Sequence, residues 1–521
     1  MGLVRIHLVE IPAQEVSFLN VYQKAAAEPT AAFFLKNKSP MDKGYKIALS
    51  TLLGLSVFSF WMWLYPQDLA YQEQNQLFLF TWDYLRERLA LPGGLADYLS
   101  EFLVQLFYVR VLGAIIMALL AVFLQLAVWK AAGKKPALYA LSFIPSLLVL
   151  VYQGDVDVLM SFPVALLLSA ALCPLFEKAG WHRLWLIPLG WWLVGPMIAL
   201  PVLLSVIRGR KWQDVVILVW LGITFYAEYR LLAPQYPLRD ALFGVNYYRL
   251  VETRPVLQWA IPAATLVCIL LCGLGLEFRR SALANSILLA ILALGTWGGV
   301  SLTYNKDTQE TLAYDWLIRT KKYAEVLSRA RKYQPRNAVS ASAVNLCLFL
   351  EGQLTDHFME YYQCGTEGLI LPSIRDNMSD APSAEALWMM GMPNITLQYS
   401  FDLQESIQNG RKSGRFTARI AECNIVNGWY DRASHYLGIL EKSLFYRQWA
   451  QERKAMIQDE AKVMADPYYA YIRSVRFTND FITQYEALDL MMALLYNQNK
   501  NNFMAAEYYS VWQKLKSLEG K

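Results

Sequence analysis

Long apolar stretches dominate the chain from residue 45 to residue 304 and become sparse afterwards. A helix needs about 20 apolar residues to cross the hydrocarbon core of a bilayer. Stretches of about that length are Ile47–Leu64, Val111–Trp129, Ala137–Tyr152, Val158–Phe176, Leu184–Ile207, Val215–Leu232, Trp259–Leu276 and Ala282–Leu302. This pattern predicts an all-α protein, with a polytopic transmembrane helical bundle over residues 45–304 and a soluble domain over residues 305–521. Residues 1–44 have little periodicity, and we expect a disordered or over-called leader there.

The loop that follows the first predicted span, residues 65–108, has a helical period of its own. Its apolar side chains recur every three or four residues, at Leu77, Phe80, Tyr84, Leu85 and Leu89. Arg86–Arg88 fall on the opposite face, so the pattern predicts an amphipathic helix at the membrane surface. Pro92–Gly94 should end this helix, and Leu95–Phe107 should form a second one.

Basic residues in the short loops indicate how the predicted spans are oriented. Leu184–Ile207 could form one helix, or a hairpin of two short helices broken at Gly195-Pro196. Only the hairpin puts all the basic loops on one side, and such loops are enriched on the cytoplasmic side. These loops contain Lys43, Lys46, Lys130, Lys134, Lys135, Lys178, Arg183, Arg208, Arg210, Lys211, Arg279 and Arg280. We therefore expect nine crossings or near-crossings and a cytoplasmic N-terminus. The loops at 65–108, 153–157 and 233–258 and the C-terminal domain should then lie outside.

The C-terminal domain repeats one spacing at four places. A turn residue is followed two residues later by an apolar or aromatic residue and then by a second helical stretch, at Lys321–Val326, Gly352–His357, Gly428–Tyr436 and Asn501–Tyr509. Such a turn lets two antiparallel helices meet while the large side chain fills the gap between them. The spacing resembles the tetratricopeptide helix hairpin, although the repeats are unevenly spaced. We expect a soluble tetratricopeptide-like helical-hairpin domain that binds proteins or packs on the bundle.

Composition supports a membrane protein and argues against a nucleic-acid partner. The chain is 55% hydrophobic and only 17% charged, against about 25% charged in soluble domains. Much of its net charge of +5 lies in the predicted inner loops, and no basic stripe with interleaved aromatic residues occurs. The six cysteines have no metal-ligand spacing and are expected to be buried, although one disulfide in an exported tail stays open.

Carboxylates in the predicted outer loops are candidate functional groups, with Asp68 and Glu73 as the catalytic pair and Asp155 and Asp157 as substrate-binding residues. Asp68 and Glu73 follow the first span, and Asp155 and Asp157 come from another outer turn. If these side chains converge, they could act as a general base or bind a divalent metal, the one cofactor that such a group would suit. The alternative is that they are solvated turn residues, which is favoured for Asp155 and Asp157 and is evenly balanced for Asp68 and Glu73.

Arginines in the third outer loop are the candidate substrate-binding groups. Arg239, Arg249 and Arg254 could bind a lipid phosphate. The alternative is that they extend to the membrane surface among aromatic residues and bind nothing in particular.

The arrangement of a first helix, a long acidic outer loop, further spans and an exported tail resembles membrane glycosyltransferases of the GT-C type. That resemblance implies a polyprenyl-phosphate-linked sugar as substrate and gives the catalytic or metal-binding role to Asp68 or Glu73. The paired acids often seen in that class are replaced here by two acids five residues apart.

From Tyr45 onward the chain is also similar to an uncharacterised family of Gram-negative bacterial membrane proteins. The segments that carry this similarity are Tyr71–Leu85, Leu91–Tyr108, Asn345–Leu354 and Gly428–Ala450. The family is a domain of unknown function, so the similarity implies a multi-pass architecture and a place in the bacterial inner membrane, and it indicates no particular reaction. Two functions stay open: a GT-C-like transferase, or a non-catalytic scaffold in the bilayer whose periplasmic repeats bind envelope proteins.

Overall fold

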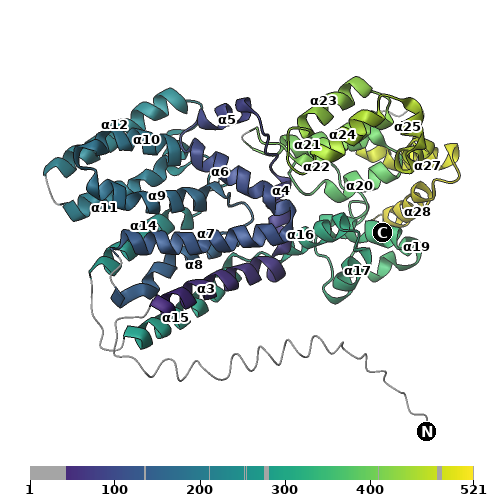
Figure 1. Cartoon of the computed structure of the whole chain (residues 1–521). Coiled ribbons are helices and arrows are strands. Elements are labelled where there is room, and N and C mark those ends of the chain that lie inside the picture. The colour runs from purple at the N-terminus through teal and green to yellow at the C-terminus, as the bar shows by residue number, and fades with distance from the viewer. Residues whose placement is uncertain are drawn as a thin grey trace, which may run out of the picture.

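The computed structural model describes residues 43–133, 136–209, 212–250, 253, 255–274, 281–408, 410–477 and 484–519. Most of these residues are helical, and β-type pairing among the described residues is limited to isolated bridges such as Val158 with Tyr248. The predicted all-α class is therefore confirmed. The predicted leader lies outside the described residues except for Lys43 and Gly44, which begin the first described helix. Figure 1 shows two groups of helices, the bundle that ends with α15 and the tail that begins with α16.

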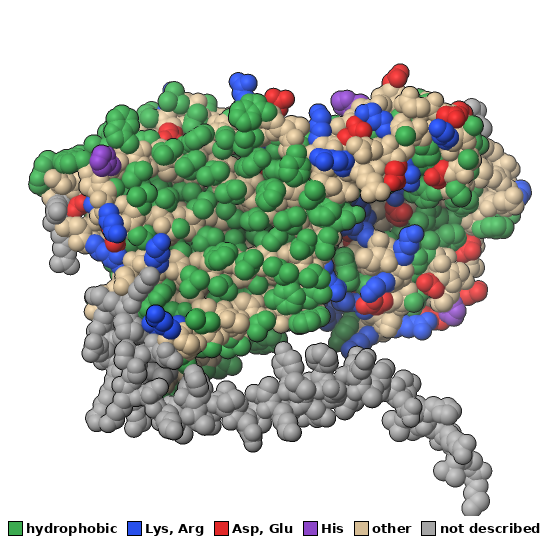
Figure 2. All heavy atoms as spheres, in the orientation of Figure 1, with side chains coloured by type: hydrophobic (Ala, Val, Ile, Leu, Met, Phe, Trp, Pro, Cys, Tyr) green, Lys and Arg blue, Asp and Glu red, His purple; other side chains and the backbone are tan. Residues whose placement is uncertain are grey.

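The bundle contains long apolar helices that run roughly parallel to one another (Figure 1). Its elements are α3 (Lys43–Ser59), η1 (Phe60–Leu64), α4 (Pro66–Gln74), α5 (Trp82–Leu89), α6 (Gly94–Val104), η2 (Gln105–Tyr108), α7 (Arg110–Ala131), η3 (Pro136–Phe143), α8 (Ile144–Tyr152), α9 (Ser161–Lys178), η4 (Gly180–His182), α10 (Arg183–Val194), η5 (Gly195–Ile198), α11 (Ala199–Gly209), α12 (Trp212–Leu232), α13 (Leu238–Phe243), α14 (Leu257–Gly273) and α15 (Ser281–Thr303). Six stretches among the described residues are long and apolar enough to cross a membrane. Figure 2 shows a broad apolar surface over this half of the molecule, as a membrane protein requires.

The stretch Gly180–Gly209 counts as one candidate span by length and composition, yet the chain reverses direction inside it. Arg183, at the start of α10, donates a hydrogen bond to Asp214 at the start of α12 (3.1 Å). Arg208, near the end of α11, donates one to the carbonyl of Ala131 at the end of α7 (2.9 Å). Both ends of the stretch therefore lie at one end of the bundle, and the predicted hairpin is confirmed. The reversal occurs at Gly195, whose φ of 63° and ψ of −147° suit glycine.

The described basic loop residues lie together at the end of the bundle that is remote from the tail. They stand at or near helix ends, as Lys43 and Lys46 of α3, Lys130 of α7, Lys178 of α9, Arg183 of α10 and Arg208 of α11. The ammonium group of Lys46 lies 5.0 Å from the ring of Trp129 near the end of α7, and Arg208 pairs with Glu177 near the end of α9. Lys134, Lys135, Arg210, Lys211, Arg279 and Arg280 lie outside the described residues. We call this the basic end, and we call the end that carries the tail the tail end.

The tail is a series of helix pairs. Its elements are α16 (Lys306–Arg319), α17 (Tyr323–Lys332), α18 (Ala338–Leu350), α19 (Leu354–His357), η6 (Phe358–Glu360), α20 (Ala381–Met389), α21 (Pro393–Glu405), α22 (Gly414–Val426), α23 (Tyr430–Leu440), α24 (Arg447–Met456), α25 (Glu460–Ala465), α26 (Pro467–Val475), η7 (Tyr485–Ala487), α27 (Leu488–Gln498) and α28 (Phe503–Glu519). Each of the four predicted turns lies between two of these helices, and Lys321, Gly352 and Gly428 have the positive φ of a tight turn. The tetratricopeptide likeness itself stays a prediction. None of the six cysteines, which all lie among the described residues, forms a disulfide, so the possible disulfide of the tail is absent.

In the segment 65–108, the first predicted amphipathic helix begins later than expected. Residues 75–80 form no helix, and helix α5 starts only after Thr81, whose hydroxyl caps it by accepting a hydrogen bond from the backbone of Tyr84 (3.2 Å). Leu77 instead packs into a hydrophobic cluster of the tail with Trp388 and its neighbours. The backbone N–H of Phe80 donates to the carbonyl of Lys442 (2.8 Å). Tertiary contacts with the tail therefore override the local helical period.

Replacement of Leu77 by alanine tests this contact between loop and tail. We expect Leu77→Ala to lower the free energy of unfolding by about 2–4 kcal/mol, because a buried leucine loses its packing and leaves a cavity. Denaturant unfolding in detergent, followed by tryptophan fluorescence, measures the change. The matched control is Trp82→Ala, which removes an exposed side chain of the same segment and should change the value by less than about 0.5 kcal/mol. Equal effects of the two variants would contradict the packing described here.

Candidate functional site

Helix α4 places Asp68 and Glu73 close to the end of the first candidate span but in different surroundings. Pro66 occupies the first turn of α4, where its missing N–H needs no partner. The two acids are five residues apart, which separates them by about 140° around a helix. Their residues are only 2% and 4% exposed, respectively, so neither is a solvated turn residue.

Asp68 lies in an almost closed space between α4, the turn after α8 and the tail. Its Oδ2 accepts a hydrogen bond from Gln309 Nε2 (3.0 Å), and its Oδ1 has no partner. The space beside it, lined in part by Trp61 and Gln153, has a volume of about 10 Å³, which is far too small for a substrate. Burial raises the pKa of Asp68 to about 8, and the Gln309 hydrogen bond only partly opposes this shift. Asp68 is therefore largely protonated at neutral pH.

This buried acid gives the protein a pH-dependent stability. Its folded-state pKa of about 8 lies above the usual value of 3.8, so the folded state keeps a proton that the unfolded chain releases between these values. The contribution of Asp68 to folding therefore becomes less favourable as the pH rises through this range. We expect Asp68→Asn, which mimics the protonated acid, to raise the free energy of unfolding at pH 8.5 by at least about 2 kcal/mol more than it does at pH 5.

Denaturant unfolding at both pH values measures this effect. Asp83→Asn is the matched control, because it changes an exposed carboxylate of the neighbouring helix α5. A stabilisation by Asp68→Asn of the same size at pH 5 and pH 8.5 would contradict a raised pKa.

Glu73 lines instead a polar cavity between bundle and tail. The volume of this cavity is about 550 Å³. Its walls combine aromatic side chains with paired charges. The aromatic residues are Phe107, Tyr108, Trp316, Phe416, Phe445, Tyr446 and Trp449, and the charged ones are Glu73, Arg319, Glu385, Arg415, Arg419 and Glu422. Helix α4 and the turn η2 supply one wall, and the tail supplies the others. We call this space the junction cavity.

Glu73 is held loosely at the wall of the junction cavity. Its Oε2 lies 3.6 Å from Arg319 Nη2, and its Oε1 accepts a long hydrogen bond from the hydroxyl of Tyr446 (3.5 Å). Burial raises the pKa of Glu73, and the guanidinium of Arg319 opposes part of that shift. A carboxylate with a raised pKa and few close partners is a stronger base than an ordinary carboxylate, as proton abstraction requires.

The other arginines of the junction cavity are tied to carboxylates of the tail. Arg415 Nη1 donates to Asp315 Oδ1 (2.9 Å) and to Gln74 Oε1 (2.6 Å). Arg419 pairs with Glu385 (2.5 Å) and Glu422 (3.1 Å). Each guanidinium is thus fixed in place, as preorganised recognition of a polar ligand requires.

Three of the five predicted substrate-binding residues, Asp155, Asp157 and Arg249, form a separate group beside α4, where Arg249 Nη2 donates to Gln72 Oε1 (3.4 Å). Asp155 Oδ2 accepts a hydrogen bond from the hydroxyl of Tyr248 (2.8 Å). Arg249 Nε lies 3.4 Å from Asp157 Oδ1, and its guanidinium lies 5.3 Å from the centre of the Tyr71 ring. These groups are partnered with one another and do not line the junction cavity. Arg239 is exposed on α13, and Arg254 lies outside the described residues.

A second buried network, which the sequence did not suggest, joins the tail to the bundle. Arg411 of the tail donates to Asp97 Oδ1 (2.6 Å), and its Nε lies 2.8 Å from Glu101 Oε1. Arg88 Nε donates to the other oxygen of Glu101 (2.8 Å), and Ser161 donates to Asp97 (2.6 Å). Arg88 is thus buried, which corrects its assignment to a polar outer face. Two acids four residues apart on an apolar helix were a signal for such a site, but their distant partner was not visible.

Metal binding and other cavities add no further candidate. No group of three or more His, Cys, Asp or Glu side chains within the described residues could hold a metal, so the donors here do not fit the divalent ion considered above.

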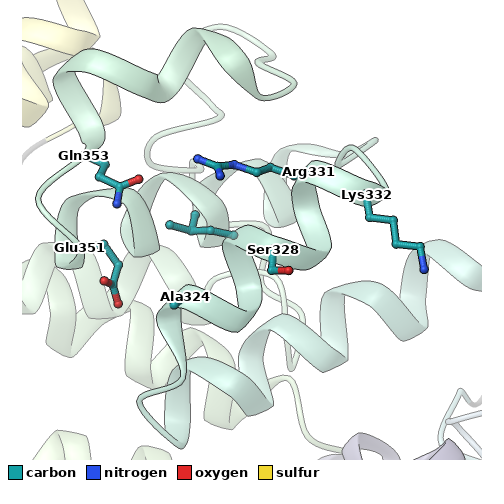
Figure 3. A pocket seen from close by; sticks show the side chains of 7 residues that line it. Ala324, Ser328, Arg331, Lys332, Glu351 and Gln353 are labelled. Carbon is teal, nitrogen blue, oxygen red and sulfur yellow. The ribbon is translucent and has the colours of Figure 1, made fainter. Parts of the chain in front are cut away.

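A groove on the tail, about 470 Å³ in volume, is lined by α17 and the turn after α18. In Figure 3, Arg331 points toward Gln353 across this groove and Lys332 points away from it. Both basic residues are exposed, whereas the charged residues of the junction cavity are buried or half-buried.

Comparison with known proteins gives a family but no activity. A model described as a family of unknown function, DUF6057, matches residues 43–517, so the chain belongs to that family. No curated protein and no solved structure matches the chain. Any function must therefore come from the geometry of the site.

Proposed function

We propose that this member of DUF6057 is a multi-pass protein of a bacterial inner membrane, with its basic end in the cytoplasm and its tail in the periplasm. Six candidate spans, the apolar surface of the bundle and the clustering of basic loop residues at one end support this placement. The tail would then be a periplasmic tetratricopeptide-like domain that covers the outer end of the bundle.

In this membrane the protein acts as a GT-C-like transferase on a polyprenyl-phosphate-linked sugar. One observation carries the proposal: Glu73, from the first outer segment, lines a cavity of about 550 Å³ at the tail end of the bundle. A cavity of this size accommodates a small sugar, and its position next to the spans lets the lipid carrier stay in the bilayer.

The walls of the junction cavity suit a carbohydrate. The rings of Trp316 and Trp449 offer apolar surfaces to the C–H faces of a sugar, and the fixed carboxylates and guanidinium groups offer acceptors and donors to its hydroxyls. Arg319 is paired only loosely with Glu73, so it is the guanidinium best placed to bind the phosphate of the carrier.

The reaction would use Glu73 as general base. Glu73 takes the proton of an acceptor hydroxyl, whose oxygen attacks the anomeric carbon of the donor sugar. The bond between that carbon and the phosphate oxygen breaks, and the electron pair leaves with the polyprenyl phosphate. Arg319 stabilises the negative charge on the departing phosphate. Asp68, although predicted together with Glu73, would act only by holding α4 in position through Gln309.

Incubation of the purified protein with polyprenyl-phosphate-linked sugars tests the proposal directly. The expected result is release of polyprenyl phosphate, and a strain that lacks the protein should accumulate the lipid-linked sugar and lose a glycan. If no donor turns over and the glycan profile of that strain is unchanged, the transferase is refuted. Loss of envelope-protein complexes in the same strain would then favour the scaffold, with the tail as its binding surface.

A further inference from the structure

An apolar groove runs along the outside of the bundle, far from the junction cavity. It lies between α3 and α7 and has a volume of about 690 Å³. Its walls come from Ile47, Leu55 and Phe58 on one helix and from Leu119, Val122 and Leu126 on the other. Gly54 and Ala118 are the small residues that hollow it out. We call it the lipid-side groove because several of its side chains, including Ile47 and Leu55, are exposed on the apolar surface of the bundle.

Two lysines stand at the basic end of this groove. Lys43 is exposed and Lys46 is half-buried. The ammonium group of Lys46 lies 5.0 Å from the centre of the Trp129 ring and 5.8 Å from that of Tyr139, so aromatic faces hold this charge at the mouth of the groove. The described ion pairs include neither lysine. Two positive charges are therefore available beside an apolar channel.

The buried polar side chains at the floor of the groove are hydrogen-bonded to one another. The hydroxyl of Ser50 donates to Gln125 Oε1 (2.8 Å) and lies 2.8 Å from the hydroxyl of Tyr139. These polar atoms therefore satisfy one another inside the bundle. What remains for an occupant is hydrocarbon contact along the groove, the hydroxyl of Thr51 and positive charge at one end.

We propose that the lipid-side groove binds one anionic phospholipid, with an acyl chain in the groove and the phosphate on Lys43 and Lys46. The interval from Lys43 to Phe58 spans about 22 Å of helix, which exceeds the ~15 Å depth of one leaflet, so a whole acyl chain fits. Charge complementarity selects an anionic headgroup over a zwitterionic one. The lipid belongs to the leaflet at the basic end, and this inference rests on the membrane placement proposed above.

Titration of the purified full-length chain with phosphatidylglycerol tests the site. Phosphatidylcholine and soluble glycerol phosphate are titrated in parallel as comparison ligands. Binding is measured by native mass spectrometry and by the shift of the thermal unfolding midpoint. We expect phosphatidylglycerol to bind and stabilise, phosphatidylcholine to do so weakly, and glycerol phosphate to have no effect. Binding by glycerol phosphate would overturn the proposal in favour of a plain phosphate site, and equal binding of the two lipids would overturn the anionic selectivity.

Variants separate the two parts of the site. Lys43→Gln combined with Lys46→Gln should weaken phosphatidylglycerol binding roughly 20–30-fold, at about fivefold for each lysine. Thr51→Trp should fill the groove and abolish binding while leaving both lysines in place. Lys130→Gln, at the same end but outside the groove, is the matched control and should bind like the wild type. Unchanged binding by either test variant would overturn the proposal.

The membrane placement is checked separately, so that the two failures can be told apart. Extraction of membranes at alkaline pH should leave the chain in the membrane fraction. Release of the chain would refute the placement and the lipid site together. Retention of the chain without a preference for phosphatidylglycerol would refute the lipid site alone.

Discussion

Replacement of Arg411 by methionine is expected to loosen the tail from the bundle and to lower the free energy of unfolding by about 3–5 kcal/mol. Arg411, Asp97 and Glu101 are all buried, with side chains that are 6%, 4% and 1% exposed. Without the guanidinium, Asp97 and Glu101 face each other with only Arg88 to compensate them, and solvent cannot reach either acid. Denaturant unfolding in detergent measures the loss, and limited proteolysis around residues 406–413 reports the loosening.

The matched control for Arg411 is Arg375, another tail arginine beside a carboxylate. Arg375 is 78% exposed and lies 3.9 Å from Asp402, so Arg375→Ala should change stability by less than about 0.5 kcal/mol. A double variant, Arg411→Met with Glu101→Gln, should recover part of the loss because it removes one uncompensated charge. If Arg411→Met costs no more than Arg375→Ala, the network does not hold the two parts together.

The structure explains why parts of the fold could be predicted and others could not. The hairpin at Gly195 could be predicted from the basic residues of the loops. Their enrichment on one side of a membrane orients every span of the chain, so it can be used without knowing how the helices pack. The helix expected from Leu77 failed because the partner of Leu77 lies in the tail, about 300 residues later in the chain. The capping residue Thr81 was a local signal for the later start of α5.

The candidate site could be predicted only in part for the same reason. The first outer loop pointed to Asp68 and Glu73, and both are buried with unusual pKa values. The sequence could not show which of the two acids lines a cavity, because the residues that surround Glu73 come from the tail. They are Arg319 at the end of α16 and Tyr446 just before α24. The pairing of Asp97 with Arg411, 314 residues apart, is likewise a product of tertiary structure.

Replacement of Glu73 by glutamine is expected to reduce turnover of the lipid-linked sugar by about 10²–10⁴-fold, the usual contribution of general acid–base catalysis. Glutamine keeps the size of the side chain and its contact with Tyr446, but it cannot take a proton. Binding of the donor should change much less, so the loss should fall on kcat rather than on KM. Glycan production in a strain that carries only this variant provides a second readout.

Two further variants make the Glu73 result specific. Asp83→Asn alters an exposed carboxylate of the same outer segment and should leave turnover unchanged. Asp68→Asn should reduce turnover at neutral pH far less than Glu73→Gln, because Asp68 is already largely protonated there and does not line the junction cavity. If Asp68→Asn and Glu73→Gln reduced turnover equally, the loss would reflect a disturbance of helix α4 and not the removal of a general base. If Glu73→Gln kept full activity, Glu73 would not be the general base, and the junction cavity would at most bind the substrate.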